Sequence, residues 1–128
     1  MSLLGSLFAG GGAAGSQIEN MSASSAVQFH ADPETVFVDV RGLGEIQMSG
    51  TIAGAVKAPL PELGSHARPE GGGSLPAVAD NKRIILVCAS GARSGVAAQQ
   101  LASMGYTQVA NLRGGIGAWA QAGGPMER

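Results

Sequence analysis

The sequence predicts a single α/β domain with a central, mostly parallel sheet that is flanked by helices on both faces. Apolar segments typical of strands alternate with helix-forming segments along most of the chain. The run at 36–40 is β-branched and aromatic apart from Asp39 and does not alternate with polar residues, which is typical of a strand buried on both faces, as in a parallel sheet. A chain of 128 residues has room for one such domain with one core.

The first half of the domain contains two predicted strands and two short helical segments. Ser22 can cap a short helix that ends near His30. The strand at 36–40 is followed by residues 43–50, which can form a short helix or a turn. A brief second strand is predicted at 55–58 and ends before a proline.

The second half contains the strongest strand prediction, at 83–87. The stretch at 60–81 before it is mainly loop, with a possible helix at 60–66. After the strand, a segment rich in Ala, Gln and Leu predicts a helix that reaches Met104. Two further elements complete the domain, a strand at 109–112 and a helix at 116–122.

The segments outside the predicted domain are short. We expect the folded domain at 17–125, a flexible Gly/Ala-rich leader at 1–16 and a C-terminal tail at 126–128. A small Leu and Phe cluster in the leader is similar to the apolar core of a secretory signal. No Lys or Arg precedes this cluster, and it is shorter than the roughly 20 residues that cross a bilayer. We therefore expect no membrane span, and docking to a partner is an alternative role for the cluster.

Composition excludes several classes of function. Eight basic residues stand against nine acidic ones, a net charge of -1, so a nucleic acid or an anionic membrane is not expected as the main partner. The chain has one cysteine, which excludes an internal disulfide framework and a metal site built from several thiolates. A free thiol is simplest to explain in a reducing compartment, and we expect a cytoplasmic protein.

Cys88 stands at the carboxyl end of the predicted strand at 83–87, and the chain passes from it directly into a helix. Ligands of α/β sheets collect at this end of the strands. The residues after Cys88 are small, so successive backbone N–H groups can curve around the sulfur and form a cradle for an anion. Gly91 can adopt a positive φ there without a steric penalty. The small loop residues are Ala89, Ser90, Gly91 and Ala92.

Such a cradle favours the thiolate form of Cys88. The helix N-terminus and the charge of Arg93 are both expected to lower the pKa of the thiol from about 8.5, which gives a nucleophile near neutral pH. The alternative is an inert core cysteine, which is common after an apolar strand. The run S-G-A-R-S at 90–94 favours the nucleophile.

Four motifs in order resemble the rhodanese family of sulfurtransferases. They are F-V-D-V-R at 37–41, G-T-I-A-G-A at 50–55, C-A-S-G-A-R-S at 88–94 and L-R-G-G-I-G-A-W at 112–119. The resemblance covers roughly residues 17–125. After Gly50 many rhodaneses carry His-Ile-Pro-Gly-Ala, whereas this chain has Thr51 in place of the His and Ala53 in place of the Pro. We expect this departure to alter the stiffness of the loop and to leave the chemistry intact.

The resemblance implies that Cys88 accepts sulfane sulfur from thiosulfate or a related small anionic donor. A cysteine persulfide forms, sulfite leaves, and a thiol, a protein acceptor or cyanide then removes the sulfur. This chemistry requires no metal and no organic cofactor, and a monomer or weak homodimer is sufficient. With no second cysteine to discharge the persulfide, the sulfur must pass to another molecule.

Two other functions compete with this interpretation. One is a non-catalytic or protein-specific sulfur-carrier or binding module. The other is a phosphatase or arsenate reductase of the related cell-cycle phosphatase architecture, which also uses a loop from Cys to Arg before a helix. Those phosphatases have five residues between Cys and Arg, whereas four separate Cys88 from Arg93.

Several polar residues near the loop have two interpretations. Arg93, within the active-site loop by resemblance, can contact the donor or brace the loop. Arg41 and Asp39 end the first strand and can share the rim with Cys88, where Arg41 could bind thiosulfate. The alternative for Arg41 is an ion pair with Glu45 or Asp39.

Hydroxyl groups and histidines complete the candidate residues. Ser90 and Ser94 can donate hydrogen bonds to the sulfur, although Ser94 is equally suited to support the first helical turn. No motif surrounds His30 or His66, and both are expected to be exposed rather than to form a metal site. The two glycines at 114–115 are expected to act only as a connection from strand to helix.

Overall fold

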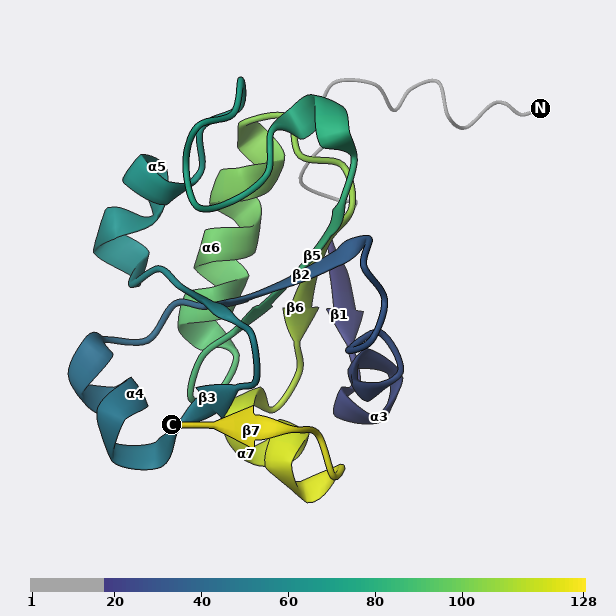
Figure 1. Cartoon of the computed structure of the whole chain (residues 1–128), viewed down its shortest axis with the longest axis vertical. Coiled ribbons are helices and arrows are strands. Elements are labelled where there is room, and N and C mark those ends of the chain that lie inside the picture. The colour runs from purple at the N-terminus through teal and green to yellow at the C-terminus, as the bar shows by residue number, and fades with distance from the viewer. Residues whose placement is uncertain (1–17) are drawn as a thin grey trace.

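The computed structural model describes residues 18–128 and contains a parallel sheet of five strands (Figure 1). Their order across the sheet is β1, β6, β5, β2, β4, and every neighbouring pair is parallel. The expected flexible leader at 1–16 lies outside the described residues. The strands are β1 Glu19–Met21, β2 Thr35–Asp39, β4 Val56–Lys57, β5 Arg83–Val87 and β6 Val109–Leu112.

The central strand β5 is apolar after its first residue, Arg83, because both of its faces are covered. Ile84 and Leu86 pack into one core cluster, which includes Leu101 of the long helix α6. Ile85 and Val87 point to the opposite face and join a second cluster. Side chains alternate between faces along a strand, so two buried faces require an unbroken apolar run.

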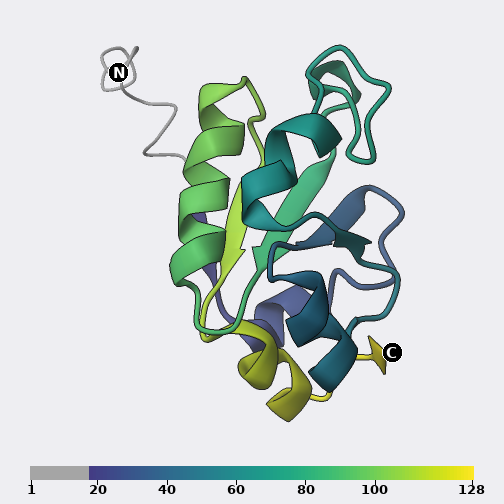
Figure 2. The same cartoon turned by 90° about the vertical axis from the view of Figure 1, so that its left-hand side faces the viewer.

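Helices cover both faces of the sheet, as predicted (Figures 1 and 2). The face with Ile84 packs against α6 and α5, and the other face packs against α3 and α7. The helices are α3 Ala23–Val27, α4 Leu43–Ser49, α5 Leu63–His66, α6 Ala92–Ser103 and α7 Gly115–Gln121, with 3-10 turns η1 Leu60–Glu62 and η2 Val78–Asp80. Within residues 18–128 none of these helices has the length and apolar character needed to cross a bilayer.

Local signals account for the ends of several helices. Ser22 caps α3 as predicted, because its Oγ accepts a hydrogen bond from the Ser25 N–H at 3.2 Å. The helix is shorter than predicted and gives way to turns after Val27. The α6 helix ends where predicted, next to Gly105, whose φ of 110° is the left-handed conformation that glycine tolerates.

The C-terminal residues differ from the expected tail at 126–128. Strand β7, Met126–Glu127, pairs antiparallel with β3, Thr51–Ile52, in a separate two-stranded sheet. The Trp119 Nε1 donates to the Pro125 carbonyl oxygen at 2.9 Å, which anchors the residue immediately before this strand. A strand of two residues carries no detectable periodicity, so the sequence gives no indication of it.

His30 is also placed differently from the expectation of an exposed side chain. Its Nε2 lies 2.8 Å from the Ala53 carbonyl oxygen, and the side chain is partly buried. The ring centroid lies 5.9 Å from that of Phe37 and 5.8 Å from that of Trp119. His30 therefore serves as a packing residue of the second core.

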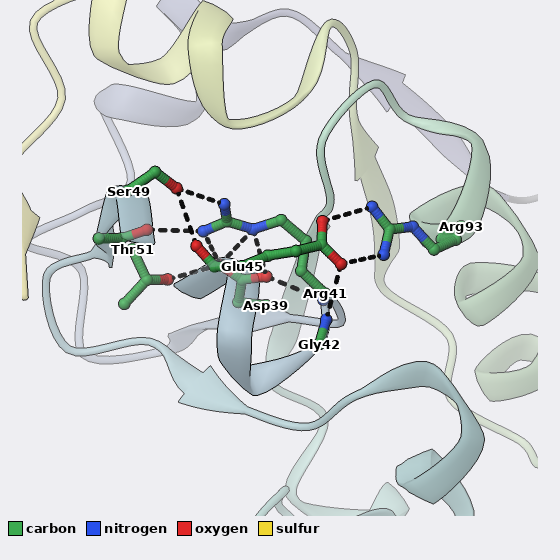
Figure 3. Close-up of polar contacts among 8 residues, drawn as sticks. Asp39, Arg41, Gly42, Glu45, Ser49, Thr51 and Arg93 are labelled. Atoms are coloured by element: carbon green, nitrogen blue, oxygen red, sulfur yellow. Dashed lines mark hydrogen bonds and ion pairs between the residues drawn. The ribbon is translucent and has the colours of Figure 1, made fainter. Parts of the chain in front are cut away.

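A buried ion pair fastens the carboxyl end of β2 (Figure 3). Arg41 Nη2 lies 2.8 Å from Asp39 Oδ2, and the two side chains are 3% and 0% exposed. The remaining Arg41 donors reach Ser49 Oγ at 2.8 Å and the Gly50 carbonyl oxygen at 2.6 Å. Thr51 Oγ1 donates to the same carboxylate at 2.7 Å. This network joins β2, the end of α4 and β3.

The turn at 114–115 does more than connect β6 to α7, contrary to expectation. A Cβ on Gly115 would collide with the carbonyl group of Ala89, and its φ of 71° is left-handed. The next residue, Ile116, donates its N–H to the Cys88 carbonyl oxygen at 2.9 Å. The backbone of this turn therefore supports the segment that follows β5.

Removing one partner of the buried ion pair should destabilise the fold. We expect Asp39→Ala to cost about 3–5 kcal/mol, because it leaves the Arg41 charge buried without its partner. The double variant Asp39→Leu with Arg41→Met removes both charges and should lose much less. Urea unfolding measures both. Equal losses in the two variants would contradict a dominant role for the unpaired charge.

Two glycines of α7 provide a matched pair of substitutions. Gly115→Ala should lower the free energy of unfolding by at least about 2 kcal/mol, because of the left-handed φ and the clash with Ala89. Nothing lies within 4 Å of a Cβ placed on Gly117. Gly117→Ala should therefore be neutral or stabilise by up to about 1 kcal/mol in urea unfolding. A neutral Gly115→Ala would show that the turn does not support the loop.

Candidate active site

Cys88 follows β5 directly, and its side chain is buried. It is 0% exposed and belongs to the core cluster that faces α6. The thiol therefore lies in the core rather than on the surface of the loop. The loop backbone reaches the surface at Ala89 and Ser90, which are exposed, but the sulfur points inward.

Hydrogen-bond donors of the loop converge on the sulfur from the helix side. The Gly91 N–H lies 3.1 Å from Cys88 Sγ, and the Ser94 hydroxyl lies 3.3 Å from it. Gly91 has a φ of 110° and is the residue that caps α6, in agreement with the expected positive φ. The sulfur thus occupies the position at the start of α6 where an anion is favoured.

Burial and hydrogen bonding act in opposite directions on the thiol. Burial raises the pKa of Cys88, but hydrogen bonds from the Ser94 hydroxyl and from the N–H groups of Ser94, Gly91 and Ser90 outweigh it and lower the pKa to about 7. We expected the charge of Arg93 to be a main cause. The leading favourable contributions are instead hydrogen bonds within the loop.

The two loop serines have different places. Ser94 is fully buried on α6 and contacts the sulfur through its hydroxyl, as one of the two interpretations predicted. The Ser90 side chain is exposed, and its Oγ accepts from the Ala92 N–H at 3.5 Å. Ser90 therefore contributes its backbone N–H, and not its hydroxyl, to the environment of Cys88.

Arg93 spans from α6 to α4 (Figure 3). Its two terminal nitrogens lie 2.7 Å and 2.9 Å from the carboxylate oxygens of Glu45. Glu45 also accepts the Gly42 N–H at 3.2 Å, and these contacts, that of Arg93 first, lower the pKa of Glu45 to about 2. The pair is therefore charged at any ordinary pH. This geometry favours the bracing interpretation of Arg93.

Asp39 and Arg41 reach the same edge of the sheet as Cys88, as predicted. Strands β2 and β5 are neighbours, and Asp39 lies opposite Val87. The guanidinium of Arg41 is nevertheless 3% exposed and directed to Asp39, Ser49 and Gly50. The structure favours the ion-pair alternative with Asp39 over anion binding by Arg41.

Sequence reasoning missed a buried amide next to the loop. Asn111 of β6 lies 2.6 Å from Ser94 Oγ through its Oδ1, and its Nδ2 donates to the Gly91 carbonyl oxygen at 3.1 Å. One signal was available, because Asn111 is the one polar residue of a buried apolar strand. Glu45 was considered only as a partner of Arg41. Gly115 was interpreted only as part of a connection.

The remaining titratable candidate lies away from this loop. His66 Nδ1 is 2.9 Å from Ser74 Oγ. Across residues 18–128, no three side chains of His, Cys, Asp or Glu are grouped closely enough to hold a metal ion. The chemistry available at the site is that of a thiolate held by N–H and O–H donors.

Known proteins resemble the chain over most of its length. A protein of Allochromatium vinosum named "Sulfurtransferase" is 37% identical over 110 residues, which cover 85% of this chain and 94% of the relative. A Rhodopseudomonas palustris structure, described as a protein of unknown function and possible tyrosine phosphatase, has a TM-score of 0.78 and 34% identity over 89% of this chain and 88% of its own.

A third similarity is to a larger protein. The structure of a thiosulfate sulfurtransferase from Pseudomonas aeruginosa has a TM-score of 0.68 and 28% identity, covering 91% of this chain and 21% of that one. The model of the Rhodanese-like domain matches residues 22–122. This match extends from the cap of α3 to the end of α7 and includes β5, the loop after Cys88 and α6. The chain belongs to the rhodanese-like domain family.

Proposed function

We propose that this chain is a sulfurtransferase that carries sulfane sulfur as a persulfide on Cys88. The observation that supports this most is the set of hydrogen bonds on the sulfur, with the Gly91 N–H at 3.1 Å and a thiol pKa of about 7. A thiolate is the reactive form of cysteine toward sulfur. We propose thiosulfate, or a related small anion, as the donor, in line with the name of the Pseudomonas aeruginosa relative.

The reaction proceeds by double displacement. The Cys88 thiolate attacks the outer sulfur of thiosulfate, a new S–S bond forms, and sulfite leaves with the electron pair of the bond that breaks. The negative charge then lies on the terminal persulfide sulfur. A thiol, a protein acceptor or cyanide attacks this terminal sulfur, and Cys88 leaves as a thiolate. No external oxidant or reductant is consumed.

The loop residues have distinct roles in this scheme. The N–H groups of Ser90, Gly91 and Ser94 stabilise the negative charge on Cys88. The small side chains of Ala89 and Ala92 leave the loop backbone free to approach the sulfur. Because no part of Cys88 is exposed, a donor can reach the sulfur only when the loop moves.

Phosphatase activity is the second candidate, because the Rhodopseudomonas palustris relative carries that description. Two observations oppose it here. Four residues separate Cys88 from Arg93, one fewer than in the related phosphatases, so the ring is smaller. Both terminal nitrogens of Arg93 are bound to Glu45 rather than open to a phosphoryl group. Hydrolysis of an aryl phosphate faster than sulfur transfer would favour the phosphatase.

A sulfur carrier that serves one protein acceptor uses the same persulfide. Slow transfer to cyanide together with fast transfer to one protein would favour this carrier role. The single cysteine is consistent with either role, because the sulfur must leave to another molecule. A reducing compartment such as the cytoplasm would keep the thiol available.

The direct test is the intact mass of the protein after treatment with thiosulfate. We expect a gain of one sulfur atom per chain, which cyanide then removes as thiocyanate. Cys88→Ser should show neither the gain nor turnover above the uncatalysed background, because no other thiol is present.

The Cys88→Ser control is valid only if the variant folds, since Cys88 is part of the core. Circular dichroism and urea unfolding check this. An unchanged mass of the native protein, under conditions where an independent rhodanese is loaded, would refute the proposal. Sulfur gained by Cys88→Ser would refute the assignment of the nucleophile.

The rate of sulfur loading should depend on the ionisation of Cys88. With a thiol pKa of about 7, the single-turnover rate should rise with pH, reach half its maximum near pH 7 and level off above pH 8. The reason is that only the thiolate attacks. The pH profile is measured by quenching the loading reaction at set times and determining the loaded fraction by mass spectrometry. A half-maximum near 8.5, the value for an ordinary thiol, would show that the loop does not favour the thiolate.

A further inference from the structure

Asn111 has an orientation that its neighbours determine. Its Nδ2 donates to the Gly91 carbonyl oxygen at 3.1 Å and to Asn20 Oδ1, on the adjacent strand, at 3.2 Å. A carbonyl oxygen can only accept, so the nitrogen of the amide must face the loop. The amide oxygen then faces Ser94, whose Oγ lies 2.6 Å away. The side chain is buried, with 9% exposure.

Two acceptors therefore compete for one proton. Ser94 has a single hydroxyl hydrogen, and both Asn111 Oδ1 and Cys88 Sγ lie within hydrogen-bond distance of its oxygen. When Cys88 is a neutral thiol, its S–H can donate to Ser94 Oγ, and the hydroxyl donates to Asn111. When Cys88 is a thiolate, the hydroxyl turns to the sulfur, and Asn111 Oδ1 loses its donor in a buried position.

We propose that Asn111 is a positioning residue that holds the Ser94 hydroxyl proton while the sulfur of Cys88 is uncharged and yields it when the sulfur becomes a thiolate. The inference deepens the proposed function and rests on Cys88 as its reacting group. In the persulfide the charge lies on the outer sulfur, so the Ser94 proton returns to Asn111. In the last step Cys88 leaves as a thiolate and takes the hydrogen bond again.

The charged groups around the loop do not explain such an effect. The Asp39 and Arg41 pair follows β2, and Glu45 pairs with Arg93 between α4 and α6. Arg113 follows β6 and is exposed. None of these groups forms a hydrogen bond with Ser94 or Asn111. The competition depends on two neutral side chains, and an uncharged substitution of either leaves the surrounding charges unchanged.

The competition predicts that substitutions of Asn111 and Ser94 shift the pKa of the Cys88 thiol in opposite directions. Asn111→Leu leaves the sulfur as the sole acceptor for the Ser94 proton, so the thiol pKa should fall by about half a unit to one unit. Ser94→Ala removes the donor to the thiolate, so the thiol pKa should rise by a similar amount, about half a unit to one unit. In the Ser94→Ala background, Asn111→Leu should have no further effect on the pKa.

The measurement is the pH dependence of alkylation of the full chain by iodoacetamide. The chain has one cysteine, so the rate reports Cys88 alone and requires no sulfurtransferase activity. Failure of this inference is therefore distinguishable from failure of the proposed function. Asn20→Ala is the matched control. It removes the other partner of the same amide, does not touch Ser94, and should leave the pKa unchanged.

A rise in pKa for Asn111→Leu, or a shift that persists without the Ser94 hydroxyl, would overturn the proposal. If Asn111→Leu does not fold, Asn111→Asp provides the test, because its carboxylate holds the Ser94 proton more strongly and should raise the thiol pKa. Asn20→Asp places the same charge on the neighbouring strand without contact to Ser94. Equal shifts in these two aspartate variants would also overturn the proposal.

Discussion

The contact between the Gly91 N–H and the Cys88 sulfur is the interaction on which the site depends. A buried thiol is ordinarily kept neutral, because removing a charge from water is costly. Here a donor at 3.1 Å and a hydroxyl at 3.3 Å reverse that preference. The same burial strengthens each hydrogen bond, since water does not compete for the sulfur. A loop that presented the sulfur to solvent would gain access and lose part of this stabilisation.

The fold maintains this contact mainly through the backbone of neighbouring segments. Gly91 must be left-handed to aim its N–H inward, and Gly115 must lack a Cβ for the α7 turn to approach Ala89. The Asn111 Nδ2 donates a hydrogen bond to the carbonyl oxygen of the same residue, Gly91. The loop is thus fixed from β6, from α7 and from its own helix. The buried Asp39 and Arg41 pair fixes the adjacent strand end in the same way.

Features that depend on local pattern were predictable from the sequence, and those that depend on distant contacts were not. The apolar run of β5 and the small residues after Cys88 predicted a strand, a cradle and a positive φ at Gly91, which the structure contains. Strand β7 has two residues and no periodicity of its own. Arg93 pairs with Glu45, which lies 48 positions away. Nothing in the sequence favours Arg93 over Arg41 as the partner of Glu45. The burial of Cys88 depends equally on tertiary packing.

The two arginines that the sequence offered for anion binding are both engaged elsewhere. Arg41 is buried against Asp39, and Arg93 is held by Glu45 with a carboxylate whose pKa of about 2 keeps the pair charged. Stabilisation of negative charge therefore depends on neutral N–H and O–H donors at fixed positions. Such donors suit the single charge of a thiolate or a persulfide. A phosphoryl group carries charge on several oxygens and is ordinarily bound by the two terminal nitrogens of an arginine. Here Arg93 would first have to break its contacts with Glu45. The geometry of the loop thus favours sulfur chemistry over phosphoryl chemistry, because both arginines are already paired with carboxylates.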